Sequence, residues 1–207
     1  MQRHLIATVA ATLVAAANAH ADGYGRGFPD NNAFLPAAPM TMGASASTKM
    51  VGGAAMYPTR DIIDNAVNSR DHTTLVAAVK AAGLVDTLKT PGPFTVFAPT
   101  NMAFGALPAG TVDTLLKPEN KAMLVQILTA HVVAGTYDTG RIRELLRDGG
   151  GRGVLETVSG DLIALEMRGD DLYVIDENAH GARVTIADVD QSNGVIHVVD
   201  GVLLPAS

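Results

Sequence analysis

The chain contains 207 residues, of which 47% are hydrophobic and 17% are charged, and it carries a formal net charge of −6 at pH 7. This length and composition favour one folded domain of ordinary size with extensions. The acidic residues are dispersed and the basic residues form no cluster, which argues against a nucleic acid as the partner. The sequence contains no cysteine, so an exported form would depend on its hydrophobic core without disulfide bonds.

Residues 1–21 have the pattern of a secretory signal peptide. A short polar start with Arg3 precedes an apolar stretch over residues 5–17, and Ala-His-Ala at positions 19–21 matches a signal peptidase site. The apolar stretch is too short to span a bilayer comfortably. We expect cleavage before Asp22, with a cut after Ala19 as the alternative. The mature protein would then have no transmembrane segment and would reside in the periplasm or outside the cell.

Residues 22–56 are predicted to form a flexible linker. Glycine and proline recur there, and the apolar residues follow neither helical nor strand spacing. A methionine-rich metal tract is the alternative interpretation, but the methionines are too widely spaced to favour copper. We predict no metal site, and we place the folded domain over residues 57–207.

The first part of this domain has the apolar spacing of helices, and the last part has strand-like runs. Helices are predicted near residues 59–67, 73–82, 84–88, 100–104, 111–116, 118–131 and 142–146. Strands are predicted over residues 94–98, 132–133, 154–158, 162–168, 172–176, 182–187 and 195–204. Helices followed by strands is the order expected of an α+β domain with an antiparallel sheet.

The last predicted strand is apolar on both of its faces. Ile196 and Val198 fall on one face, whereas His197 and Val199 fall on the other. A strand without a polar face is buried on both sides. We therefore expect one face to contact a second sheet and the other to contact helices.

Three segments resemble the signature segments of the fasciclin (FAS1) domain family. They are Phe-Thr-Val-Phe-Ala-Pro-Thr-Asn at 94–101 with Phe104, Leu-Thr-Ala-His-Val-Val at 128–133, and Asn-Gly-Val-Ile-His-Val-Val-Asp-Gly-Val-Leu-Leu-Pro at 193–205. The chain is similar to the short secreted single-domain bacterial members in particular. The resemblance covers residues 57–205 and implies a wedge-shaped antiparallel β-sandwich with several helices packed along one edge. It also implies that the structural core of the motifs is formed by Phe94, Phe97, Ile196, His197 and Val198.

Two positions depart from the family pattern. Ala130 stands where many members have an aromatic residue before the central histidine, and Ala134 stands where many have proline. The aromatic–histidine pair is the feature usually invoked for integrin adhesion in animals. We therefore do not transfer an integrin receptor to this chain.

The candidate binding residues are the family-motif positions Thr100, Asn101 and His131. Thr100 occupies the expected N-cap position of a helix after Pro99. Asn101 either bonds its own turn or faces a ligand. His131 either contacts a partner or bonds nearby backbone, and His197 is expected to be a core histidine.

No motif for catalysis is present. The sequence has no Gly-x-Ser-x-Gly, no His-x-x-x-His and no P-loop ending, so we predict neither catalytic residues nor a cofactor. The segment 188–199 resembles a calcium loop, but its glycine comes one place late and its last position is valine, which favours a hairpin turn.

We expect an exported, non-enzymatic interaction module for cell adhesion or for surface or matrix binding. Its partner would be an extracellular or periplasmic protein or a surface polymer. The alternative is a soluble carrier of an apolar small molecule such as a carotenoid, which some fasciclin-like proteins hold. A hydrolase with an unrecognised site is the third hypothesis.

Overall fold

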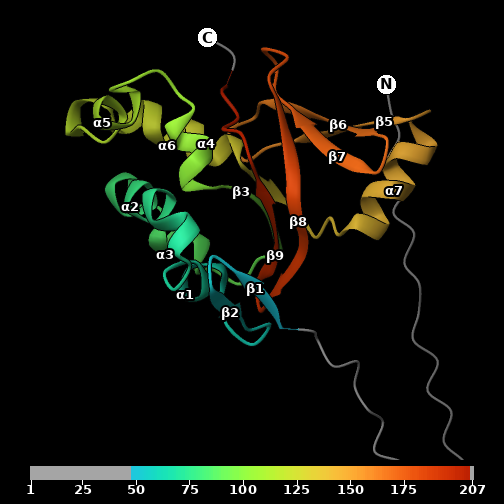
Figure 1. Ribbon diagram of the computed structural model, residues 1–207, viewed down its shortest axis with the longest axis horizontal. Helices are drawn as coiled ribbons and strands as arrows, with labels where there is room; N and C mark the ends of the chain where they lie inside the picture. The colour runs from blue at the N-terminus through green and yellow to red at the C-terminus, as the bar shows by residue number, and fades with distance from the viewer. Residues whose placement is uncertain (1–47, 206–207) are drawn as a thin grey trace, which may run out of the picture. The chain divides into compact units, whose positions relative to one another are not determined.

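The computed structural model describes residues 48–205 (Figure 1). The predicted signal peptide and most of the predicted linker lie outside these residues. The helices are α1 Ile62–Ala66, α2 Thr73–Ala82, α3 Val85–Leu88, α4 Asn101–Gly105, α5 Thr111–Leu115, α6 Lys121–Ala130 and α7 Thr139–Asp148. The strands are β1 Lys49–Val51, β2 Ala54–Met56, β3 Phe94–Pro99, β4 Val132–Ala134, β5 Arg152–Glu156, β6 Leu162–Arg168, β7 Asp171–Ile175, β8 Gly181–Gln191 and β9 Gly194–Val199.

A seven-stranded sheet with the order β4-β3-β9-β8-β7-β6-β5 forms the centre of the domain. Neighbouring strands are antiparallel except β3 and β9, which are parallel. After β5 the chain returns to β4, where Thr157 bridges Val133 and the Val158 amide donates to the Val132 carbonyl at 2.7 Å. The sheet therefore curls until it almost closes on itself.

The predicted α+β class is confirmed, but one curled, mixed sheet takes the place of the two separate sheets of a sandwich. The physical reason lies in β8, which is 11 residues long and pairs with β7 at one end and with β9 at the other. Its register with β9 shifts on both sides of Ile186, and Asp188 within the irregular stretch has a φ of 54°. Such bulges bend a strand, so β8 carries the sheet around a corner without interruption.

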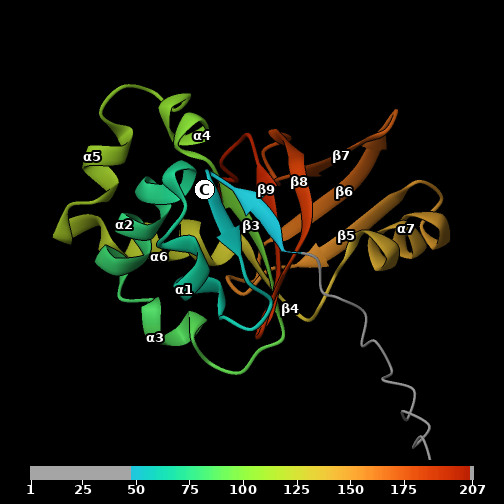
Figure 2. The same ribbon diagram turned by 60° about the horizontal axis from the view of Figure 1, so that its bottom comes forward.

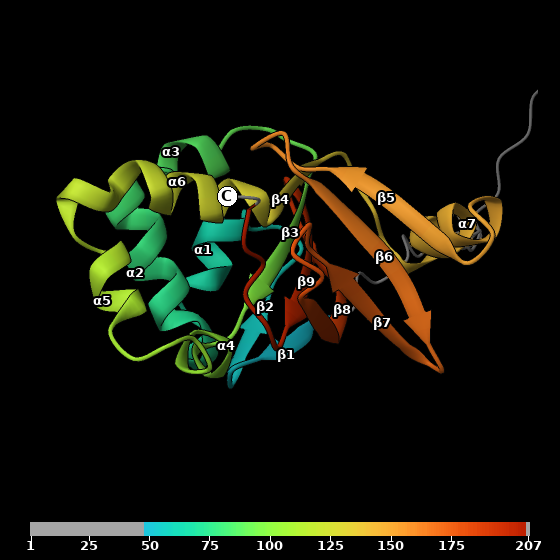
Figure 3. The same ribbon diagram turned by 90° about the horizontal axis from the view of Figure 1, so that it is seen from above.

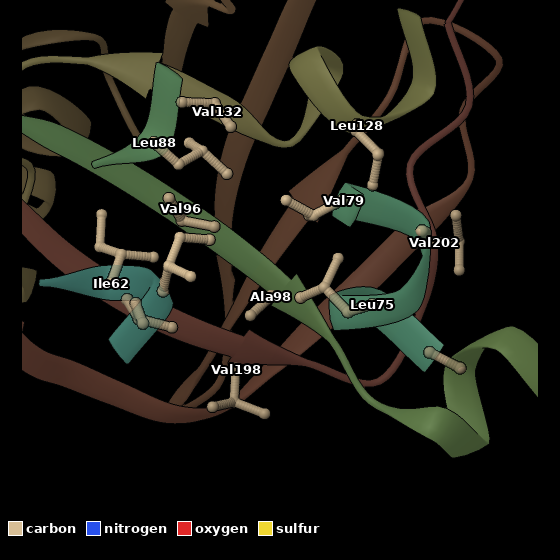
Figure 4. Close-up of a cluster of buried hydrophobic side chains, with 14 of the residues drawn as sticks. Ile62, Leu75, Val79, Leu88, Val96, Ala98, Leu128, Val132, Val198 and Val202 are labelled. Carbon is tan, nitrogen blue, oxygen red and sulfur yellow. The ribbon is translucent and has the colours of Figure 1, made fainter. Parts of the chain in front are cut away.

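The helices α1 to α6 lie on one side of β3 and β9, and the strands β5 to β7 with α7 lie on the other (Figure 3). A first hydrophobic core fills the space between these helices and the sheet (Figure 4). A second core fills the inside of the curled sheet, where Ile142 and Leu146 of α7 pack against strand residues such as Leu165. The central pair of strands therefore separates two cores.

Strand β9 is buried on both faces, as its sequence predicts. Ile196 and Val198 belong to the first core, and Val199 belongs to the second. His197 stacks on Phe97 with ring centroids 5.6 Å apart. Burying each Val or Ile of this strand contributes about 1.5–3 kcal/mol relative to exposure. The strand ends at Val199 rather than near Leu204.

The last part of the predicted linker is folded, which corrects the domain boundary at residue 57. Strands β1 and β2 form a hairpin that packs against the domain (Figure 2), and both Val51 and Met56 are only 3% exposed. The turn consists of Gly52 and Gly53 with φ of 57° and 75°. Two consecutive residues with positive φ form the tight turn of a β-hairpin, and glycine adopts that conformation without strain. The linker prediction was based on the recurring glycine and proline of residues 22–56 and missed this hairpin.

None of the helices within residues 48–205 has the length and apolarity needed to cross a membrane.

Candidate functional site

Thr100 and Asn101 lie where β3 ends and α4 begins. The Thr100 hydroxyl accepts a hydrogen bond from the Ala103 amide at 3.2 Å, so Thr100 is the N-cap of α4. The Asn101 side chain reaches a different helix. Its Oδ1 accepts from the Thr74 amide at 3.0 Å and its Nδ2 donates to the Arg70 carbonyl at 2.8 Å.

Asn101 supplies an acceptor that helix α2 does not have in its own sequence. The N-cap position of α2 is His72, which makes no capping bond with its side chain. The first amides of a helix have no partner within the helix, so an acceptor from elsewhere stabilises its start. Asn101 thus neither bonds its own turn nor points a free amide at solvent.

The next residue, Met102, is the most exposed of the large apolar side chains in the described part of the chain, at 85%. Its backbone is held by the Thr100 cap and by the bonds of Asn101. The start of α4 therefore combines a fixed backbone with an exposed apolar side chain. Met102 was predicted only as a helix residue, and nothing in the sequence indicated its exposure.

His131 follows α6 and is only 2% exposed. Its Nε2 lies 2.9 Å from the Leu203 amide nitrogen, and its Nδ1 lies 2.8 Å from the Ile127 carbonyl oxygen. Because an amide can only donate, Nε2 must accept, and the hydrogen-bond network assigns the proton to Nδ1. Burial lowers the pKa of His131 to about 4. The ring is thus neutral, and both of its nitrogens bind backbone.

The C-terminal segment is held at two consecutive amides. His131 accepts from Leu203, and Asp176 at the end of the β7 hairpin accepts from the Leu204 amide at 2.9 Å. Leu203 is 1% exposed and belongs to the second core. His131 therefore positions the segment that follows β9.

The structure does not gather the three candidate residues into one site. Thr100 and Asn101 lie at the junction of α2 and α4, whereas His131 lies in the interior beside β3, where its carbonyl accepts from the Phe97 amide at 2.9 Å. No hydrogen bond among residues 48–205 joins His131 to Asn101.

His197 also binds backbone. Its Nε2 donates to the Tyr137 carbonyl at 2.7 Å, and its Nδ1 accepts from the Asp188 amide at 3.3 Å. Burial is the main reason that its pKa lies below the ordinary value. The ring ties β9 both to the bulge of β8 and to the segment that leads into α7.

Asn193 is a structurally important residue for which the sequence predicted a turn and the start of a family segment, but no specific contacts. It is buried, and its Oδ1 accepts from the Ile62 amide at 3.1 Å while its Nδ2 donates to the Leu88 carbonyl at 2.8 Å. These bonds join the start of α1 to the end of α3. Its position as the first residue of the family segment at 193–205 was the available signal.

An apolar cavity of about 60 Å³ lies within the first core, between α1 to α3, the start of β3 and the end of α6. Its walls include Ile63, Val79 and Leu128, and the ring of His131 forms part of one side. The exposed residues Lys80 and Val158 belong to the lining, so the cavity approaches the surface there. Residues 48–205 contain no group of three His, Asp or Glu side chains arranged to hold a metal ion.

Residues 70–205 match the family model of the fasciclin domain. The chain belongs to the fasciclin family. This confirms the resemblance recognised in the three signature segments, and the buried β3, β9 and His131 are the elements of the fasciclin domain that carry it.

Relatives of this fasciclin domain occur in bacteria. Protein sll1483 of Synechocystis sp. is 44% identical over 164 residues, covering 79% of this chain and 84% of that protein. Cell surface glycolipoprotein MPB83 of Mycobacterium bovis is 33% identical over 195 residues, covering 94% of this chain and 77% of that protein.

The fold is similar to that of a FAS1 domain pair from the insect cell adhesion molecule fasciclin I. The TM-score is 0.62 at 21% sequence identity, over 70% of this chain and 51% of that one. At this identity the likeness concerns the fold alone.

Proposed function

We propose that the protein is an exported, non-enzymatic interaction module that mediates cell adhesion or binding to a surface polymer or matrix. The observation that carries this proposal is membership of the fasciclin family together with the name of MPB83 as a cell surface glycolipoprotein. The partner is an extracellular or periplasmic protein or a surface polymer. In this proposal residues 1–21 direct export and residues 22–47 connect the signal to the domain.

The start of α4 is the contact surface that we propose for this partner. Thr100 and Asn101 hold the backbone there, and Met102 presents an exposed apolar side chain. Because the backbone there is already held, Met102 loses little backbone conformational freedom on binding. His131 enters the proposal as a residue that positions the C-terminal segment, because its own nitrogens are occupied.

Bead adhesion tests the proposal. Beads coated with the folded chain should adhere to intact source cells more than beads coated with an unrelated folded protein. Met102→Asp should reduce adhesion several-fold, because it places a charge at the contact. Met123→Asp is the matched control, since Met123 on α6 is also exposed, at 55%, and lies outside the proposed contact.

Adhesion no greater than that of the unrelated protein would contradict the proposal. Catalytic turnover that disappears when one polar residue is replaced would contradict its non-enzymatic part. Adhesion that both aspartate variants reduce equally would remove α4 as the contact surface.

A second candidate function, a carrier of an apolar small molecule such as a carotenoid, is supported by the apolar cavity. Its volume of about 60 Å³ is far below the roughly 300–1,000 Å³ of pockets for drug-sized ligands. A carotenoid therefore requires α1 to α3 to move away from β3. Helix α3 has four residues and no side-chain cap at its start, which makes it the weakest wall of the cavity.

Protein purified from its native source tests the carrier function through its visible absorption and its extractable lipids. Ala66→Leu fills part of the cavity lining and should abolish retention of the ligand. Ala77→Leu on the exposed face of α2 is the matched control. Colourless protein with empty lipid extracts would rule out this function.

A further inference from the structure

A groove of about 190 Å³ lies between α7, the β6–β7 turn and β8, and we call it the α7 groove. It adjoins the second core at the hairpin end of the curled sheet. The mouths of closed or nearly closed sheets are common places for small-molecule sites. The α7 groove is separate from the apolar cavity and from the start of α4.

The floor of the α7 groove is apolar. Ile142 and Leu172 are buried side chains of the second core, and Met167 and Val184 pack against that core while remaining partly exposed. An apolar side chain bound to this floor would remove apolar surface from water on both the ligand and the protein.

The rim of the groove carries two opposite charges that are not paired with each other. Arg143 comes from α7, and Asp170 comes from the β6–β7 turn. Neither forms an ion pair within 4.0 Å with any residue of the described range 48–205. Asp171 also lines the groove, but its carboxylate already pairs with Arg183 at 3.6 Å.

We propose that the α7 groove binds a small zwitterion with an apolar side chain, of the class of the free hydrophobic α-amino acids. The carboxylate pairs with Arg143, the ammonium group pairs with Asp170, and the side chain covers Ile142 and Leu172. The groove is smaller than the roughly 300–1,000 Å³ of sites for drug-sized molecules, which fits a ligand of this size. This inference is independent of the proposed function.

The two parts of the groove contribute differently to binding. The charges are exposed, so each adds about twofold to fivefold in affinity. Each methylene group buried on the floor adds about fourfold. The groove should therefore prefer leucine over alanine strongly, and leucine over its singly charged analogues modestly.

Titration of the 15N-labelled full chain, followed by amide NMR shifts, tests the proposal. L-leucine should shift amides of residues 139–143, 167–172 and 184–187 with millimolar affinity. The probes 4-methylpentanoate, which lacks the ammonium group, and 3-methylbutylamine, which lacks the carboxylate, should each bind about twofold to fivefold more weakly.

Two variants test whether Arg143 binds the carboxylate of the ligand and Asp170 binds its ammonium group. Arg143→Gln should reduce the affinity for leucine to that for the amine and leave the amine unaffected, and Asp170→Asn should do the reverse with 4-methylpentanoate. Arg147→Gln, an exposed residue of α7 outside the groove lining, is the matched control and should change nothing. The absence of leucine-dependent shifts at these amides, or equal leucine affinity in Arg143→Gln and the wild type, would overturn the proposal.

Discussion

Single polar side chains of the family motifs are directed at backbone atoms that helices and strands leave without partners. Asn101 completes the start of α2, Asn193 joins α1 to α3, and His131 holds the Leu203 amide. A buried amide or carbonyl without a partner is costly, so these side chains stabilise the chain at its irregular points. The main contribution of these polar residues of the family motifs is therefore to stabilise the fold.

The protonation of His131 predicts how stability depends on pH. Its pKa is about 4 in the folded state, against an ordinary value of 6.5, so the unfolded chain binds the proton more tightly. The stabilisation is complete above pH 6.5, decreases as the pH falls toward about 4, and amounts to roughly 3 kcal/mol over that range. Urea unfolding at several pH values measures this slope.

A variant without the titrating ring is the control for that measurement. His131→Gln should be less stable at neutral pH but should lose less stability on acidification. Part of the slope should remain, because burial also lowers the pKa of His72 and His197. Equal slopes in the variant and the wild type would contradict the role assigned to His131.

At the level of helices and strands, the sequence predicted those elements whose apolar spacing is regular. The helices α2 and α6 and the buried strand β3 were predicted close to their observed ranges, whereas β9 was predicted to continue to Leu204 but ends at Val199. The N-cap Thr100 was predicted because that signal is local. The bend of β8 was missed, because a bulge depends on pairing with two neighbouring strands.

The candidate site was less predictable than the fold. The sequence identified His131 and Asn101 as polar residues in motifs, but their partners Leu203 and Thr74 are remote in the chain. Which backbone atom a polar side chain reaches is set by tertiary packing, and no local pattern encodes it. For the same reason the exposure of Met102 and the α7 groove became visible only in the structure.

The β1–β2 hairpin predicts a measurable contrast between two adjacent residues. Val51 is buried in the first core, whereas Met50 is 61% exposed. Val51→Ala removes buried methyl groups and should lower the free energy of unfolding by about 1–3 kcal/mol. Met50→Ala is the matched control and should change it by less than about 0.5 kcal/mol. Small, equal effects in urea unfolding would mean that the hairpin does not belong to the cooperative domain.

The two cores share the central strands β3 and β9. Val96 and Val198 belong to the first core, while Phe97 and Val199 of the same strands belong to the second. Helix α4 and helix α7, which lines the α7 groove, lie on opposite sides of these strands (Figure 3). The proposed contact with a partner and the proposed small-molecule site therefore do not compete for surface.

Because β3 and β9 belong to both cores, the domain should unfold as one unit. Leu128→Ala in the first core and Leu165→Ala in the second should each lower the free energy of unfolding by about 2–5 kcal/mol. Far-ultraviolet circular dichroism and tyrosine fluorescence should give coincident transitions in both variants. A domain in which one core melts first would show two midpoints, with the Leu128→Ala variant losing helix signal while the fluorescence near the second core stays native. Coincident transitions are expected instead, because each core loses the strands that form one of its sides once β3 and β9 separate.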